Sequence, residues 1–235
     1  MIVKKVLNNI LDSDNKIIIP EWVKKVKIDV GTSLSAPNSE IWLQKESDLM
    51  VFGFEPNIHN IKVLYEGQNF WPHHIQKERI DKSFFLIRCA LSNEIKESQK
   101  FYCTGNNNSG TSSLFEPKTF EVLDIIDVPV ITLNDFFDFF PWDKVEYIDQ
   151  VKIDAQSSDF NIIKGMDRYM QDKVVFIDVE THTNGQYYSE EYPIDLKNYM
   201  IERNFECINW GINSTFLNTK LKNKLNKINY HILDM

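Results

Sequence analysis

Two short apolar strands that each stop at a polar loop constrain the fold of this chain more than any other feature. The first, Val26–Val30, is followed by Gly31, and the second, Leu49–Phe54, is followed by Glu55. In open α/β sheets, a small-residue turn after the first strand and an acid at the tip of the second hold the ribose of a nucleoside. The pair therefore predicts an open α/β sheet with a nucleoside ligand at the carboxyl ends of its strands.

Further apolar runs extend this sheet, and segments of helical length separate them. The expected strands are Val26–Val30, Leu49–Phe54, Phe84–Cys89, Val145–Ile153, Val174–Val179 and Phe205–Trp210. The expected helices are Ser39–Ser47, Ile58–Glu66, Leu133–Phe140, Ser158–Met170 and Leu196–Arg203. This alternation predicts βαβ units and a mainly parallel sheet. Near the end of the chain, Phe205–Trp210 and Ser214–Asn218 flank a short turn, which predicts an antiparallel hairpin at one edge.

Length and composition bound the organisation of the chain. With 235 residues, 43% of them hydrophobic, the chain is long enough for one well-packed domain and short for two. We therefore expect a single domain over residues 1–235, with its core at about 25–219 and a polar, lysine-rich helix or tail over 220–235. Two stretches read as excursions from the core, Asn69–Lys82 and Thr104–Ser113, and each is either a functional lid or a surface loop.

Charge and cysteine content exclude several classes of protein. The net charge of -8 argues against a nucleic-acid partner, because such proteins carry a basic footprint. Three widely spaced cysteines without a CxxC pair argue against a disulfide framework. The sequence shows neither a signal peptide nor a run of about 18 apolar residues that would span a bilayer. We therefore expect a cytoplasmic protein whose partner is a small molecule; the sequence does not predict its oligomeric state.

The Gly31 loop limits the kind of nucleoside. It reads Gly31-Thr32-Ser33-Leu34-Ser35, without the further glycines of GxGxxG, and no GxxxxGK[ST] occurs in the chain. Those glycines let backbone approach a pyrophosphate, so their absence argues against a dinucleotide and favours a nucleoside without phosphates, such as S-adenosylmethionine. Asp29 would then lie near the methionine end. The structural alternatives are a plain turn at Gly31, a strand-end acid capping the loop at Asp29, and a helix-dipole acid at Glu55.

A second group of polar residues follows two later strands. Asp154 follows the expected strand Val145–Ile153. Glu180 and His182 follow the expected strand Val174–Val179. Strand ends of an open sheet carry the active site, and a carboxylate or imidazole there can take a proton from an attacking hydroxyl. We therefore predict Asp154, Glu180 and His182 as catalytic candidates, with a polar loop residue as the alternative for His182. No metal site is expected, because the adjacent His73 and His74 point apart.

Several segments in this order resemble the FkbM-type S-adenosylmethionine-dependent methyltransferases, from about Lys25 to Tyr188. The matching segments are Ile28-Asp29-Val30-Gly31, Phe54-Glu55-Pro56-Asn57, Cys89-Ala90-Leu91-Ser92, Ile131-Thr132-Leu133-Asn134-Asp135-Phe136, Val151-Lys152-Ile153-Asp154-Ala155-Gln156 and Ile162-Ile163-Lys164-Gly165. The most specific are the Thr-Leu-x-Asp-Phe segment and the Lys-Ile-Asp segment with its following Leu-Lys-Gly-like segment, in which Ile163 replaces leucine.

The resemblance implies a Rossmann-like, mainly parallel seven-stranded sheet with an antiparallel last strand. It also implies transfer of a methyl group from S-adenosylmethionine, usually to oxygen and often on a sugar or natural product. By motif, Asp29 and Gly31 would border the methionine part of the cofactor and Glu55 the ribose. Ala90 and Leu91 would border the adenine, and Asp154 would face the reacting centre.

We add Ser33, Ser35 and Asn57, from the same two loops, as predicted cofactor contacts. The chain departs from the family pattern in both loops. Ser35 stands where Gly-Ala-Asn-x-Gly has its second glycine, and Gln156 and Ser157 stand where Lys-Ile-Asp-x-Glu-Gly has its acid and its glycine.

The sequence therefore predicts an S-adenosylmethionine-dependent methyltransferase acting on a hydroxyl oxygen of a saccharide or small metabolite. Two alternatives remain open at this stage. The first is a degenerate methyltransferase fold kept as a binding or scaffold module, which the two altered loops suggest. The second is a nucleotide-dependent oxidoreductase of related architecture, which the missing glycines disfavour.

Overall fold

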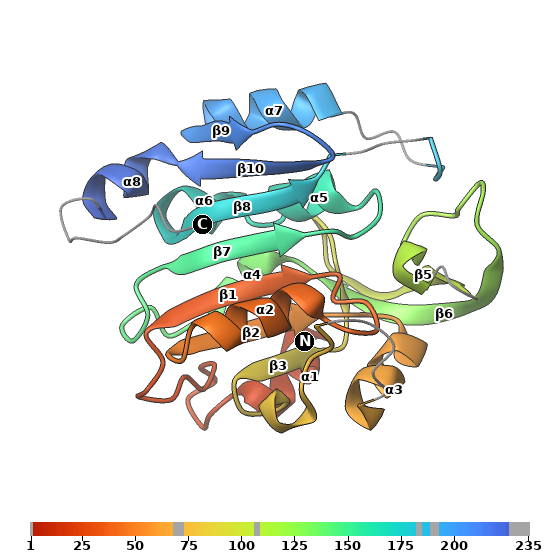
Figure 1. The fold of residues 1–235 in the computed structure, drawn as a ribbon, viewed down its shortest axis with the longest axis horizontal. Helices are drawn as coiled ribbons and strands as arrows, with labels where there is room; N and C mark the ends of the chain where they lie inside the picture. The colour runs from red at the N-terminus through yellow and green to blue at the C-terminus, as the bar shows by residue number, and fades with distance from the viewer. Residues whose placement is uncertain (1, 68–72, 106–108, 182–184, 189–192, 226–235) are drawn as a thin grey trace.

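A seven-stranded sheet forms the centre of the protein (Figure 1). The computed structural model describes residues 2–67, 73–105, 109–181, 185–188 and 193–225. The strand order is β3-β2-β1-β7-β8-β10-β9, in which β10 is antiparallel to both its neighbours and the other pairs are parallel. The strands are β1 (Lys25–Val30), β2 (Leu49–Phe54), β3 (Phe84–Ile87), β7 (Ile148–Ile153), β8 (Val174–Glu180), β9 (Phe205–Asn209) and β10 (Asn213–Asn218). The predicted Rossmann-like sheet with its antiparallel edge hairpin is confirmed.

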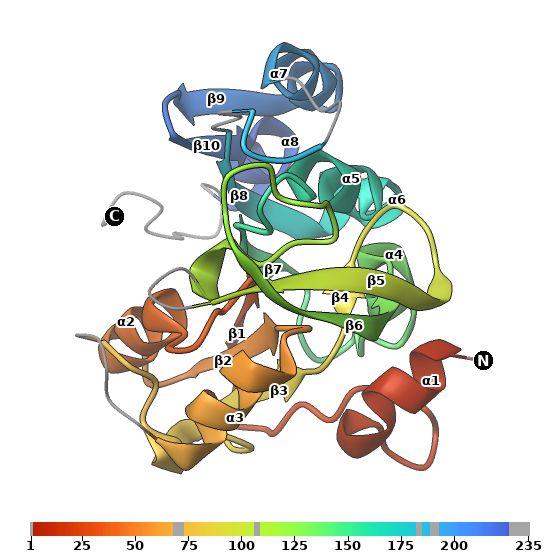
Figure 2. The same cartoon turned by 90° about the vertical axis from the view of Figure 1, so that its right-hand side faces the viewer.

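Helices cover both faces of the sheet (Figure 2). They are α1 (Ile2–Leu7), α2 (Pro37–Lys45), α3 (Ile58–Glu66), α4 (Leu133–Asp138), α5 (Asp159–Lys164), α6 (Asp167–Lys173), α7 (Pro193–Glu202) and α8 (Thr219–Leu225), with 3-10 turns at Asn8–Ile10, Lys77–Arg79 and Ser109–Thr111. The predicted helix over Ser158–Met170 is instead two helices. The first helix ends at Gly165, whose carbonyl accepts a hydrogen bond from the Asn134 N–H (2.7 Å) and where a Cβ atom would lie 2.2 Å from the Ser92 carbonyl oxygen.

The side chains of β2 point alternately to the two faces of the sheet, so this one strand contributes to two hydrophobic cores. Met50, Phe52 and Phe54 join the large core under α4, where the Phe52 and Phe136 ring centroids lie 5.3 Å apart. Leu49 and Val51 point to the other face and join the core under α2 and α3. Because successive side chains of a strand point to opposite faces, a fully apolar strand is buried on both sides. Helix α1, which we did not predict, also packs its buried residues into the large core.

A second, three-stranded sheet is the largest feature absent from the prediction. It has the order β4-β6-β5, with β4 at Ala90–Leu91, β5 at Lys96–Thr104 and β6 at Val122–Ile131. We call β5, β6 and their connection, residues 96–131, the arm. The arm crosses in front of the edge where the parallel strands end (Figure 2). The arm and β4 share a small hydrophobic core, formed by Ala90, Phe101, Cys103, Leu114, Val128 and Val130.

The chain needs a glycine where β1 ends. Gly31 has a φ of +74°, and a Cβ atom at this position would lie 1.9 Å from the Asp154 carbonyl oxygen at the end of β7. That separation is far below any contact that real Cβ atoms make. The close approach brings the ends of β1 and β7 together, so Gly31 sets the spacing of the two loops that follow.

We predict that Gly31→Ala lowers the free energy of unfolding by about 3 kcal/mol, because the methyl group collides with backbone and the residue stays in the left-handed region. Gly211→Ala is the matched control: its Cβ would lie no closer than 3.9 Å to any neighbour, so we expect a change within about 0.5 kcal/mol. Urea denaturation followed by circular dichroism measures both. An equal effect of the two substitutions would contradict this role for Gly31.

Candidate functional site

A cavity of about 330 Å³ lies between the strand ends and the arm. Its volume falls within the range of ligand pockets, roughly 300 to 1,000 Å³. Seven predicted site residues line it: Gly31, Ser33, Ser35, Glu55, Ala90, Leu91 and Asp154. Phe101 and Leu114 from the arm close the opposite wall. These seven residues therefore converge on one cavity, although they come from four separate segments.

The first loop winds tightly around one side of the cavity. The N–H groups of Gly31 and Thr32 both donate to the Phe54 carbonyl, at 3.0 and 3.4 Å, which ties the loop to the end of β2. Ser33 and Ala36 have positive φ values of 55° and 45°, whereas Ser35 does not. The position at which the family pattern has its second glycine therefore requires no left-handed backbone here. Serine at position 35 introduces no backbone strain.

Glu55 is held rigidly at the edge of the cavity. Its Oε2 accepts a hydrogen bond from the Ser33 N–H (2.7 Å), and its Oε1 accepts one from the Asn57 N–H (2.9 Å). Burial raises the pKa of Glu55 to about 7, and these backbone hydrogen bonds, with one from the Asn60 side chain, oppose that rise. The carboxylate therefore joins the first loop to the second. Since each carboxylate oxygen can accept more than one hydrogen bond, both oxygens can still accept from a ligand.

Asn57 acts as a helix cap in this structure. Its Oδ1 accepts a hydrogen bond from the His59 N–H (3.0 Å) at the start of α3, and its Nδ2 donates to Ser112 Oγ (3.1 Å) in the arm. Asn57 does not line the cavity, whereas Asn60, one turn further along α3, does. The second loop therefore contributes to the cavity through Glu55 and Asn60.

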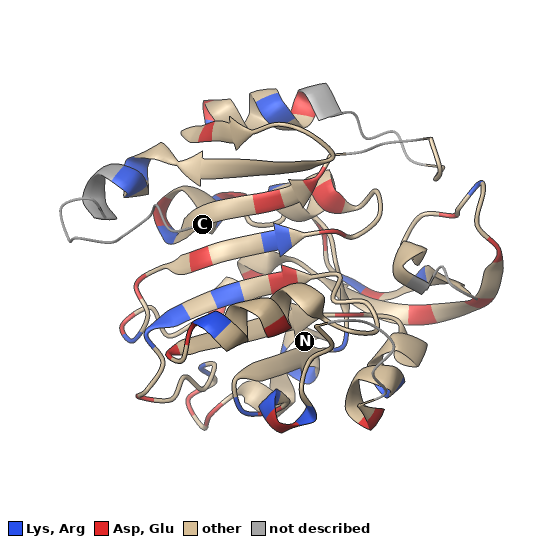
Figure 3. Ribbon diagram, viewed as in Figure 1, with Lys and Arg blue, Asp and Glu red and all other residues tan. Residues whose placement is uncertain are grey.

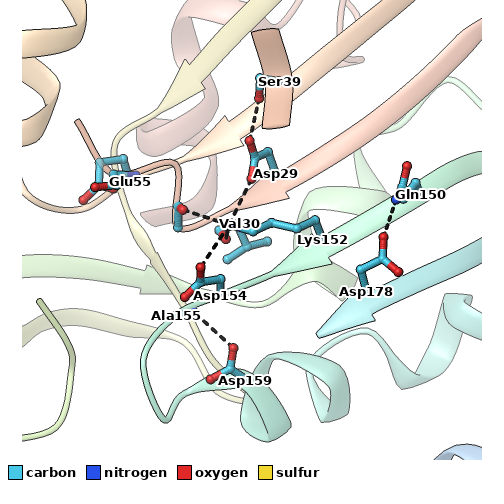
Figure 4. Close-up of polar contacts among 12 residues, drawn as sticks. Asp29, Val30, Ser39, Glu55, Gln150, Lys152, Asp154, Ala155, Asp159 and Asp178 are labelled. Atoms are coloured by element: carbon cyan, nitrogen blue, oxygen red, sulfur yellow. Dashed lines mark hydrogen bonds and ion pairs between the residues drawn. The ribbon is translucent and has the colours of Figure 1, made fainter. Parts of the chain in front are cut away.

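Asp29 does not line the cavity but pairs with Lys152, which does (Figure 4). Its Oδ2 accepts a hydrogen bond from Ser39 Oγ (2.6 Å), and its Oδ1 lies 3.3 Å from Lys152 Nζ. Burial alone would lower the pKa of Lys152, but the negative charges of Asp29 and Asp154 raise it above its ordinary value. Lys152 Nζ also lies within 3.3 Å of the Val30 carbonyl and 3.1 Å of the Gly31 carbonyl. The ammonium group thus stays charged and ties β1 to β7.

Acidic residues gather at the other end of the cavity, around the loop that follows β7 (Figure 3). Asp154 lines the cavity and its side chain is 39% exposed. Glu180, at the end of β8, does not line the cavity but is connected to Asp154 through the Gln156 side chain. Asp159 accepts a hydrogen bond from the Ala155 N–H (3.0 Å), and burial raises its pKa to about 7. Ser157, at the place of the glycine in the family pattern, has a φ of 74° and so keeps a glycine-like backbone.

Two buried hydroxyl groups at the cavity have no hydrogen-bond partner among the described residues. They are Thr32 Oγ1 and Ser158 Oγ, on residues that are 1% and 2% exposed and that line the cavity. A buried polar group without a partner costs free energy, so such groups are places where a ligand can supply the missing hydrogen bond.

Several predictions concern histidines, metals and membranes. His182 lies outside the described residues. His73 is exposed and His74 is buried. Across the described part of the chain, no group of three or more His, Cys, Asp or Glu side chains is arranged to hold a metal ion. Within the same ranges, no helix has the length and apolar character needed to cross a membrane.

Comparison with known proteins identifies the family of this chain. The family model described as "Methyltransferase FkbM domain" matches residues 30–207, which is more than half of the chain. The fold is that of a Rossmann-like methyltransferase, and the chain belongs to the FkbM methyltransferase family. No curated protein matches it.

Two solved structures resemble the chain at low identity. A methyltransferase FkbM from Methylobacillus flagellatus KT is 13% identical with a TM-score of 0.49; the match covers 85% of this chain and 44% of that one. The fibrillarin pre-rRNA processing protein of Methanococcus jannaschii is 10% identical with a TM-score of 0.40, covering 85% of this chain and 67% of that one. The chain therefore spans less than half the length of the Methylobacillus protein.

Sequence reasoning missed the parts of the cavity that depend on tertiary structure. The signal for Asn60 was present, because it lies three residues after the helix cap Asn57 and so shares a face of α3 with it. The signal for Lys152 was its place in the Lys-Ile-Asp segment. Phe101 and Leu114 gave no signal, because only the docking of the arm brings them to the cavity.

We predict that Lys152→Met lowers the free energy of unfolding by about 3 kcal/mol, because the side chain of Asp29, 1% exposed, is left buried without its counter-charge. Lys25→Met is the matched control. Lys25 pairs with Glu46 at 2.9 Å but its side chain is 34% exposed, so we expect a loss below about 1 kcal/mol. Equal losses in urea denaturation would contradict the special position of Lys152.

Proposed function

We propose that this chain is an S-adenosylmethionine-dependent methyltransferase that methylates a hydroxyl oxygen of a saccharide or small metabolite. The observation that carries the proposal is the buried Glu55 carboxylate, fixed by two backbone N–H groups at the edge of a ligand-sized cavity. A carboxylate at the tip of the second strand is suited to accept hydrogen bonds from both ribose hydroxyls. Family membership supports the same assignment.

The residues around the cavity fit this cofactor. Glu55 would hold the ribose, and Ala90 and Leu91 would contact the adenine from the apolar side that also includes Leu114. Thr32 and Ser158 have free hydroxyl groups for the polar part of the cofactor. The single glycine at Gly31 leaves backbone close to the cavity without forming a pyrophosphate loop, which disfavours a dinucleotide.

Asp154 is our candidate for the group that accepts the substrate proton. When bound, S-adenosylmethionine supplies the methyl group of its sulfonium, whose sulfur keeps the electron pair of the broken bond and becomes a thioether. The oxygen of the acceptor hydroxyl would form the new bond to carbon, and the Asp154 carboxylate would accept its proton. Glu180 would assist from its position behind Gln156, and His182 remains a candidate base by sequence alone. The chain's main contribution is to position the hydroxyl in line with the methyl group.

We predict that Glu55→Ala weakens binding of S-adenosylhomocysteine by at least about 100-fold and Glu55→Gln by about tenfold, because charge-assisted hydrogen bonds to the ribose are lost. Glu202→Ala is the control, since that side chain is 74% exposed on α7, away from the cavity. Isothermal titration calorimetry measures all three. Absence of binding to the wild-type protein would contradict the proposal and favour a scaffold role. An unchanged affinity in Glu55→Ala would contradict the ribose contact on which the proposal depends. Binding of NAD(P) instead would favour the oxidoreductase.

We also predict that this binding weakens by roughly tenfold between pH 8 and pH 6. The pKa of Glu55 is raised to about 7, so its carboxyl group takes up a proton across this range. Ribose hydroxyls donate to the ionised form, so a bound ligand favours ionisation, and affinity falls as the pH decreases through 7. Glu55→Gln should remove this dependence. A wild-type affinity constant from pH 6 to pH 8 would contradict the assignment.

A further inference from the structure

The side chain of Gln156 joins three polar groups at the reacting end of the cavity. Its Nε2 lies 2.8 Å from Asp154 Oδ1 and 3.0 Å from Glu180 Oε2, and its Oε1 accepts a hydrogen bond from the Tyr187 hydroxyl (2.9 Å). Both amide hydrogens and the amide oxygen are therefore used. The orientation follows from the neighbours, because the opposite one would set the amide oxygen against two carboxyl groups.

Contacts from the arm and from residues 185–188 hold Gln156 in this position. Its carbonyl accepts a hydrogen bond from Ser113 Oγ (2.6 Å), and the Tyr187 hydroxyl also lies 2.7 Å from the Thr111 carbonyl. Gln156 has a φ of 51°, a left-handed conformation uncommon for this residue type. Strained backbone of this kind persists where surrounding contacts fix it, and such places cluster at functional sites.

Glu180, one of the two carboxyl groups that Gln156 joins, has a raised pKa. Burial raises the pKa of Glu180, and the negative charges of Asp154 and Asp159 raise it further, whereas Lys152 lowers it. Among the described residues, the charged or titratable groups facing Glu180 are Asp154, Lys152, Asp159 and Tyr187. Two carboxyl groups sharing one site tend to hold one proton between them. Because the pKa of Glu180 is raised to about 8, this carboxyl group keeps its proton near neutral pH.

We propose that Gln156 is a positioning residue, whose amide fixes the orientation of the Asp154 carboxylate at the reacting centre and couples it to Glu180. This inference rests on the proposed function. The inference can be tested without an acceptor substrate, because the negative charge beside the sulfonium of a bound cofactor would depend on the Asp154–Glu180 pair. S-adenosylmethionine carries that positive charge and S-adenosylhomocysteine does not, so the ratio of their affinities reports the charge of the pair.

The test is the ratio of the dissociation constants of S-adenosylhomocysteine and S-adenosylmethionine, measured by calorimetry from pH 6 to pH 9. Groups that act on both ligands alike, such as Glu55, cancel in the ratio. For the wild type we expect the preference for S-adenosylmethionine to increase by about fivefold as Glu180 ionises. Glu180→Gln should remove this increase, and Asp154→Asn should lower the preference at every pH.

Removal of the Gln156 amide should move the midpoint of the curve that plots this ratio of dissociation constants against pH. Gln156→Met removes donors that favour the ionised carboxylates, so we expect the midpoint to rise by about one pH unit. Gln156→Glu, which keeps the shape of the side chain, places a third carboxyl group beside the other two and should raise it further. The matched control is Gln171→Met, which loses a hydrogen bond from Asn204 Nδ2 (3.0 Å) away from the cavity and should keep the wild-type curve.

The outcomes separate the two proposals. If neither ligand binds the wild type, the proposed function fails. If both bind with a ratio that does not change with pH, or if the curves of Gln156→Met and Gln156→Glu coincide with that of the wild type, the role of Gln156 is refuted. Should Gln156→Met fail to show a cooperative thermal transition, the isosteric Gln156→Glu variant decides the question.

Discussion

The rest of the site depends on the ion pairs and hydrogen bonds that the Lys152 ammonium group makes. It lies among the carbonyls of Val30 and Gly31 and the carboxylates of Asp29 and Asp154, so one charge satisfies groups from two neighbouring strands. A lysine beneath a cavity is costly unless such partners surround it. Parallel pairing of β1 with β7 sets Val30 opposite Ile153, and the absence of a side chain at Gly31 lets the loops that follow come into contact. Both polar ends of the cavity are built on this junction.

Each end of the cavity then has its own electrostatic character. At one end, Glu55 is a single buried acid held by backbone N–H groups, which suits it to accept hydrogen bonds from a neutral polyol such as ribose. At the other end, Asp154 and Glu180 share the Gln156 amide, which suits them to a reaction in which a proton leaves and a positive charge disappears. Phe101 and Leu114 of the arm supply apolar lining to the same cavity.

The sequence allowed prediction of the sheet because its strands are continuous apolar runs, a pattern that depends on burial alone. Strand ends such as Glu55 and Asp154 could be assigned for the same reason, since parallel strands present their carboxyl ends at one edge. The arm could not be predicted: β5 is largely polar and exposed, and its stability comes from pairing with β6 and from a small core of its own. Gln156 was visible only as a departure from the family pattern, because two of its three partners, Glu180 and Tyr187, lie 24 and 31 residues further along the chain.

The most direct test of the central claim, that this cavity binds the nucleoside cofactor through Glu55, is a crystal structure of the protein with S-adenosylhomocysteine. Our account predicts both ribose hydroxyls within hydrogen-bond distance of the Glu55 carboxylate, the adenine against Ala90 and Leu91, and the sulfur at the end of the cavity near Asp154. A ligand bound elsewhere, or one whose ribose makes no contact with Glu55, would contradict it.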